Sequence, residues 1–183
     1  MRLWLYILIS LFLFSCGDYS YIEKIDENIQ EVPDNEGWDL DMEFTEKDNI
    51  KARMHAKYMQ RKELKRDIYK TDLDSGIIVF FYNKEGVKTG KLESIRGSID
   101  EKTNILTARD SVVLFHPNGA KLYTDKLFYD SKQDLVYTDS PLLYIHNNDT
   151  INGTSFKSDS RFETYEIMNM NGKAEKLENF KIK

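Results

Sequence analysis

The sequence predicts an all-β protein of stacked antiparallel strands, and three features of the sequence support this fold class. Apolar residues recur at every second position, the apolar runs end in turn-forming residues, and the pattern repeats after 30 residues. From Ile50 to Tyr58 the alternation is strict, which places one face of a strand on a core and the other in water. Ala, Lys, Arg and Met favour a helix in this segment, but the three- and four-residue spacing of a helix is missing.

Later apolar runs end in the same way. The runs at 77–82, 105–115 and 135–145 are followed by turn-forming residues at 83–86, 116–119 and 146–149. The runs are rich in Tyr, Phe, Val, Ile and Thr, the residues that strands prefer. A turn is expected between residues 45 and 49, and residues 64–70 allow one short helical turn. Gly153 indicates a bulge, a close backbone approach or a plain turn.

A repeat of 30 residues connects the strands. Shifting by 30 positions places Leu106 on Val136, Val112 on Leu142 and His116 on His146. A period of this length is typical of stacked units, each too small to bury its own apolar face. Chance similarity among amphipathic strands is the alternative explanation.

The N-terminus reads as a secretion signal. Residues 3–14 are apolar except for Ser10 and follow Arg2. The run is shorter than the roughly 20 residues that span a bilayer, and it fits a signal peptide. Leu13 and Ser15 before Cys16 resemble a bacterial lipobox, which implies lipidation of Cys16. An ordinary signal peptide with a chance cysteine is the alternative, and no second cysteine is present to form a disulfide.

Charge divides the rest of the chain. Residues 17–41 hold nine acidic residues and one lysine, whereas the body that follows is nearly neutral. The predicted organisation is a signal peptide at 1–15, lipidated Cys16 with an acidic tether at 16–41, a β-domain at 42–170 and a tail at 171–183. The tether reads as an extended segment that holds the body off the membrane, or as a plain solvated linker. The near-neutral body argues against nucleic-acid binding.

The sequence does not suggest an enzyme. Its three histidines, His55, His116 and His146, lack metal-ligand spacing, and Asp100, Asp130 and Asp139 lie in turn-like positions. No phosphate-binding glycine loop and no nucleophile elbow occur. We therefore expect no catalytic residues, no metal and no cofactor.

A set of ordered segments resembles the LptC family. The segments are GIIVFFY at 76–82, NGAKLYTDKLFYD at 118–130, VYTDSPL at 136–142, DTINGTSF at 149–156 and Ser158-Asp159. The resemblance implies a twisted, open β-jellyroll, the β-taco fold of OstA, LptA and LptC. It also implies a periplasmic protein that accepts lipopolysaccharide from an inner-membrane ABC transporter and passes it to a bridge protein of the same fold. The best-known relatives have an uncleaved membrane helix, whereas Cys16 suggests a lipid anchor on the periplasmic face of the inner membrane.

Strand parity nominates the residues that line the lipid-binding trough, with a bulge expected after Thr124. These are Ile77, Val79, Phe81, Leu106, Ala108, Val112, Leu114, Leu122, Thr124, Leu127, Tyr129, Val136, Thr138, Leu142, Tyr144, Ile151 and Phe156. Ordinary core packing is the alternative role for each of them.

The C-terminal segment 162–168 is the candidate edge for binding the bridge protein, through Phe162, Tyr165 and Ile167. A second function fits the same pattern. The chain would then be an envelope adaptor lipoprotein that binds proteins through its sheet edges and carries no lipid.

Overall fold

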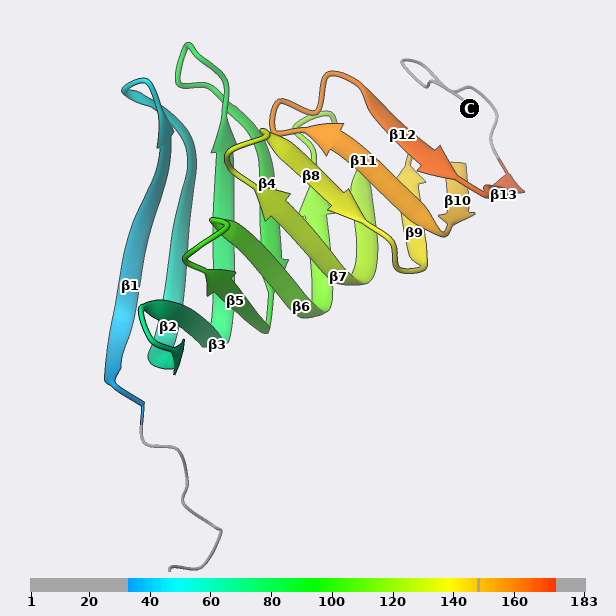
Figure 1. Cartoon of the computed structure of the whole chain (residues 1–183). Coiled ribbons are helices and arrows are strands. Elements are labelled where there is room, and N and C mark those ends of the chain that lie inside the picture. The colour runs from blue at the N-terminus through cyan, green and yellow to red at the C-terminus, as the bar shows by residue number, and fades with distance from the viewer. Residues whose placement is uncertain (1–32, 148, 174–183) are drawn as a thin grey trace, which may run out of the picture. The chain divides into compact units, whose positions relative to one another are not determined.

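The computed structural model describes residues 33–147 and 149–173, and within them it forms thirteen strands in one antiparallel sheet (Figure 1). The strands are β1 (Asn35–Glu46), β2 (Asn49–Lys65), β3 (Ile68–Tyr82), β4 (Lys88–Ser94), β5 (Arg96–Asp100), β6 (Ile105–Phe115), β7 (Lys121–Asp130), β8 (Leu135–Thr138), β9 (Leu142–His146), β10 (Asp149–Gly153), β11 (Ser155–Asp159), β12 (Tyr165–Met168) and β13 (Asn171–Lys173).

The sheet folds over into two layers because its strands bend half-way along. Residues 70–73 of β3 pair with β5, whereas residues 77–82 pair with β4, so β4 and β5 together act as one bent strand. In the same way, the two halves of β7 pair with β8 and with β9. β8 then pairs with β11, and β9 with β10. Figure 1 shows β5, β8, β11 and β12 in a front layer, with β4, β9, β10 and β13 behind it. This is the predicted open β-jellyroll.

The bends form a line that we call the seam. Asp110 and Ser111 in β6 have φ angles of 66° and 54°, and Ser75 and Gly76 in β3 have φ angles of 65° and 109°. These left-handed conformations turn a strand out of its layer. Ser140-Pro141, which follows Asp110-Ser111 by the repeat distance, separates β8 from β9. Proline donates no backbone hydrogen bond and interrupts the strand at this point.

The turns of the front layer confirm the 30-residue repeat in atomic detail. The Asp100 carboxylate accepts hydrogen bonds from the backbone N–H of Lys102 and Thr103, at 2.9 and 3.0 Å. Asp130 accepts the equivalent bonds from Lys132 and Gln133 at the same distances. One local solution for a tight turn is therefore used twice, in adjacent units.

The ends of the strands differ from the prediction in three places. β1 begins at Asn35 rather than Met42, so the end of the expected tether is an edge strand paired with β2. Residues 64–70 form no helical turn, because the chain passes from β2 into β3 through a tight turn there. Residues 171–173, expected in the tail, form β13 and pair with β10.

Candidate functional site

The candidate site is the interior between the two layers, and every residue predicted to line it is buried. Buried and less buried residues alternate within each half of β3 and β6, on either side of the seam, and through β8. A register shift occurs beside Thr124, as expected, but the extra residue lies in β6, between Arg109 and Val112. The buried residues are Ile77, Val79, Phe81, Leu106, Ala108, Val112, Leu114, Leu122, Thr124, Leu127, Tyr129, Val136, Thr138, Leu142, Tyr144, Ile151 and Phe156.

An aromatic cluster fills the middle of this interior. Phe81 in the back layer meets the edge of Tyr129 in the front layer, with ring centroids 5.1 Å apart. Phe44 also packs edge-on to Tyr129, with ring centroids 5.6 Å apart. Phe162, from the turn between β11 and β12, packs edge-on to Phe81 at 5.3 Å. These rings connect the two layers through direct contacts in the middle of the interior.

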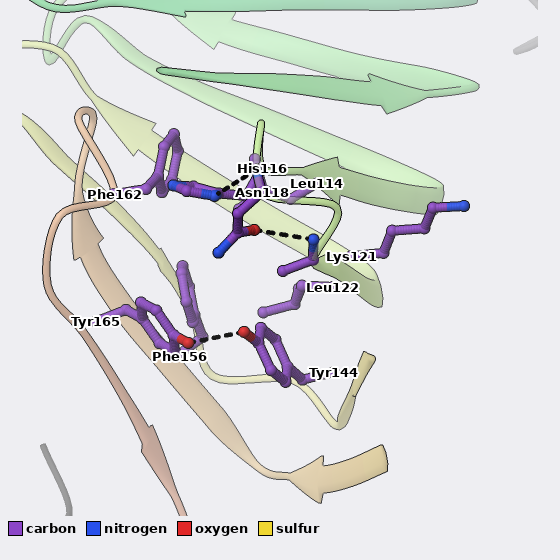
Figure 2. A pocket seen from close by; sticks show the side chains of 10 residues that line it. Leu114, His116, Asn118, Lys121, Leu122, Tyr144, Phe156, Phe162 and Tyr165 are labelled. Carbon is purple, nitrogen blue, oxygen red and sulfur yellow. Dashed lines mark hydrogen bonds between the residues drawn. The ribbon is translucent and has the colours of Figure 1, made fainter. Parts of the chain in front are cut away.

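The interior opens into a small apolar cavity towards the C-terminal strands (Figure 2). Its lining includes Leu114 and Leu122 from β6 and β7, together with Phe156, Phe162 and Tyr165. The cavity volume is about 30 Å³, whereas pockets for drug-sized ligands measure roughly 300–1,000 Å³. The cavity is therefore far smaller than a pocket for a drug-sized ligand.

Two tyrosines close this cavity from opposite layers. The Tyr144 hydroxyl in β9 lies 2.7 Å from the Tyr165 hydroxyl in β12 (Figure 2). Burial raises the pKa of Tyr144 far above its ordinary value, and its hydrogen bond to Tyr165 raises it further. Burial likewise raises the pKa of Tyr129. Both phenols stay neutral at physiological pH, which keeps the interior suited to an uncharged, apolar ligand.

The turns of the two layers face each other opposite the seam, at a margin that we call the mouth. Lys51 of the back layer lies 3.3 Å from Asp134 and 3.2 Å from Glu46. Ser160 donates a hydrogen bond to Asp134 at 2.5 Å, and its carbonyl accepts one from Thr89 at 2.8 Å. We call Lys51, Thr89, Asp134 and Ser160 the mouth latch.

Lys51 keeps its charge in the mouth latch. Burial lowers the pKa of Lys51, but hydrogen bonds and charges from Glu46 and Asp134 outweigh that effect and raise it above the ordinary value. The side chain of Lys51 is only 12% exposed, so this ion pair is shielded from solvent more than an ordinary surface pair. The latch therefore contributes to holding the mouth shut.

The predicted partner edge is only partly where the sequence placed it. β12 ends the path of paired strands, so its outer edge is free among the described residues. Phe162, however, does not belong to that edge strand. It precedes β12 and is buried against Phe81, because an aromatic side chain gains more in the interior than in the polar turn around it. Tyr165 and Ile167 lie in β12, with Ile167 buried and Tyr165 facing the cavity.

Sequence reasoning found the interior but missed what closes it. The plug formed by Phe162 and the four residues of the mouth latch were not predicted, since their contacts join turns far apart in the chain. Cys16, the signal peptide and most of the acidic tether lie outside the described residues.

A comparison with protein families identifies the chain. The family model described as "Lipopolysaccharide-assembly, LptC-related" matches residues 3–172, nearly the whole sequence. The chain belongs to the LptC family. Proteins of the LptC family are periplasmic components of lipopolysaccharide transport, and this chain is therefore one of them. The family is not enzymatic. A search of curated proteins found no match.

Two further findings bear on the described part of this LptC-family chain. Residues 33–147 and 149–173 contain no helix that is long and apolar enough to cross a membrane. In the same residues, no three His, Cys, Asp or Glu side chains gather closely enough to hold a metal ion.

Proposed function

We propose that the chain carries the acyl chains of lipopolysaccharide between its two layers. It receives the lipid from an inner-membrane ABC transporter and passes it to a periplasmic bridge protein of the same fold. One observation carries the proposal: the buried apolar interior is continuous from β1 to the C-terminal strands. At its two ends the apolar residues are only partly buried, with Leu40, Met42 and Met59 at one end and Tyr165 and Met170 at the other.

Loading requires the mouth to open, and the architecture permits this without breaking the strand pairing. Each contact described across the mouth involves at least one side chain, and none is a bond of the strand ladder. These contacts are the mouth latch, Phe162 and the Tyr144–Tyr165 pair. The strand pairing runs through the seam instead. Separating the layers at the mouth therefore leaves the ladder hydrogen bonds intact, and the seam acts as the hinge.

The energetics favour exchange rather than tight storage. Each buried methylene contributes about 0.8 kcal/mol, but a bilayer offers the same gain, so transfer into the interior is close to neutral. Direction then comes from outside the chain, and we assign that role to the ATP-driven transporter.

The anchor and the sheet edges complete the proposal. We infer that Cys16 is lipidated and holds the chain on the periplasmic face of the inner membrane. β1 and β12 each end the path of paired strands and are the candidate edges for β-strand addition. We assign the β1 end to the transporter and the β12 end to the bridge protein.

A second candidate function is an adaptor lipoprotein that binds proteins through these edges and carries no lipid. The observation that favours it is the closely packed interior, whose cavity measures only about 30 Å³. A lipid carrier must open, whereas an adaptor functions with the interior closed.

Site-specific photo-crosslinking in cells separates the two functions. A photo-reactive residue replaces Leu122, which lines the cavity, or its neighbour Tyr123, which is exposed on the outer face of β7. We expect lipopolysaccharide adducts from position 122 and few from position 123. Absence of adducts at 122, or equal adducts at both positions, would contradict the carrier function. Depletion of an adaptor would leave lipopolysaccharide on the cell surface, and depletion of the carrier would not.

A further inference from the structure

The outer face of the back layer carries a basic and aromatic hollow beside the mouth. Its volume is about 160 Å³, and its lining includes Phe80, Lys88, Lys91, Phe115, His116 and Pro117. Two lysines and three ring side chains, together with one proline, therefore line the same hollow.

The lysines are held over the aromatic rings. The Lys88 ammonium lies 3.9 Å from the Phe80 ring centroid, and Lys91 lies 4.5 Å from that of Phe115. Lys121 of β7 approaches the same Phe115 ring, at 5.7 Å. Cation–π attraction of this kind fixes the ammonium groups without neutralising them.

The positive charge of this cluster is only partly compensated. Lys91 pairs with Glu93 at 2.7 Å, and the Glu93 side chain is 41% exposed. Within residues 33–147 and 149–173, neither Lys88 nor Lys121 has an ion pair. Two ammonium groups therefore remain for an anion from solution, on a body that is otherwise nearly neutral.

The hollow and the interior cavity lie on opposite sides of one turn. His116 lines both of them, and the turn at 116–120 separates them. Figure 2 shows Leu122 directed into the cavity and Lys121, its neighbour, directed away from it. An amphiphile whose tail enters the cavity at the mouth would thus place its polar end over this turn, next to the lysines.

We propose that this hollow binds the phosphorylated sugar headgroup of the lipid whose acyl chains occupy the interior. The inference rests on the proposed carrier function and adds a headgroup site to it. Phosphate oxygens accept charge-assisted hydrogen bonds from the ammonium groups of Lys88 and Lys121. The headgroup would then stay outside while the tails are inside.

The test compares two triple variants of the full chain. The test variant carries Lys88→Gln, Lys91→Gln and Lys121→Gln. The control variant removes the same charge elsewhere, through glutamine at the exposed positions Lys57, Lys65 and Lys102. Equilibrium binding is measured with lipopolysaccharide and with the same lipopolysaccharide after chemical removal of its phosphates. Thermal unfolding of each variant shows whether its fold is intact.

We expect the test variant to bind the phosphorylated lipid about tenfold more weakly or worse, since charge-assisted contacts are lost. Binding of the dephosphorylated lipid should be unchanged, and the control variant should match the wild type. Unchanged affinity in the test variant, an equal loss for both lipids, or an equal loss in the control would each overturn the headgroup site. Failure of the wild type to bind either lipid would instead overturn the carrier function itself.

Discussion

Replacing Phe162 with alanine should open the interior, because this side chain is the main apolar plug at the mouth. Phe162 is 5% exposed and comes from a polar turn, so nothing else in that turn fills the space it leaves. Its ring also lies over Gly90: a Cβ at that position would sit 2.5 Å from the Phe162 Cε2 atom. Because position 90 is a glycine, the Phe162 ring can pack directly against the backbone of the back layer.

The expected cost in stability is moderate. Truncating a buried phenylalanine to alanine costs roughly 3–5 kcal/mol. Phe162 should fall at the lower end, about 3 kcal/mol, because it lies in a turn at the margin of the core, which can partly collapse. A urea titration followed by circular dichroism measures this loss. A control is Leu73→Ala in β3, which is equally buried, lies outside the cavity lining and should cost roughly 2–5 kcal/mol.

Binding of an apolar fluorescent probe then tests the plug itself. We expect Phe162→Ala to bind the probe severalfold more strongly than the wild type, and Leu73→Ala to bind it no more strongly. Equal gains in both variants would mean that general loosening exposes apolar surface. If Phe162→Ala loses stability but gains no probe binding, Phe162 does not control access to the interior, and our reasoning about the mouth is wrong.

Three further changes probe the groups around the interior. Tyr129→Phe should leave the free energy of unfolding unchanged or raise it by up to about 1 kcal/mol, because the buried Tyr129 hydroxyl has no hydrogen-bond partner among the described residues. A clear loss of stability in the urea titration would show that the hydroxyl does form a hydrogen bond. Asp134→Asn should destabilise the fold by about 1–3 kcal/mol, since it leaves Lys51 with one charged partner fewer in a shielded site. If Asp134→Asn costs the same stability in a Lys51→Met background as in the wild type, the two residues do not act together and the latch is contradicted. Glu101 accepts two hydrogen bonds of 2.7 Å from Arg61, which hold its pKa below the ordinary value of 4.5. Its contribution is present above pH 4.5 and is lost as the pH falls through the lowered pKa, so the stability gap between wild type and Glu101→Gln should narrow in acid; a gap that is constant with pH would exclude this linkage.

The inward face was predictable because a strand that is buried on one side has apolar residues at every second position. In β7 the inward positions change from even to odd residue numbers after Thr124. This change was visible in the sequence, since Leu127 and Tyr129 are apolar whereas Asp125 and Lys126 are charged. The seam was less visible. Residues 135–145 read as one strand, although Ser140-Pro141 held the signal for a break between β8 and β9.

β1 shows where composition misleads. Its residues include Asp39, Asp41 and Gly37, which strands disfavour, and Phe44 is its only fully buried side chain. A period of two is nevertheless present before Met42, because Trp38 and Leu40 alternate with Asp39 and Asp41. The acidic composition of the segment hid this signal and led to the prediction of a tether. The strand forms because β2 offers a complete edge, and the pairing reaches from Asn35 opposite Arg61 to Glu46 opposite Asn49. Tertiary pairing outweighs local propensity here.

The closure of the mouth was not predictable for a different reason. Lys51 and Asp134 are 83 residues apart, and each looks like an ordinary charged residue near a turn. Phe162 is a single aromatic residue in a polar turn, without neighbours that would mark it as core. Contacts of this kind depend on how the two layers face each other, which a period in the sequence does not encode.

The closed interior and the carrier function are compatible when the energies are compared. The plug contributes about 3 kcal/mol if Phe162 behaves as an ordinary buried phenylalanine. Burying about four methylenes of an acyl chain contributes about as much, at about 0.8 kcal/mol each. Measured against water, burial of an acyl tail therefore outweighs the plug. Measured against a bilayer the tail gains nothing, so displacing the plug during loading is a cost that we assign to the ATP-driven transporter. When the tail leaves, the plug returns and covers the apolar surface. Closure would therefore prevent the empty chain from exposing its interior to water, while leaving the empty and loaded states close enough in free energy for cargo to move on.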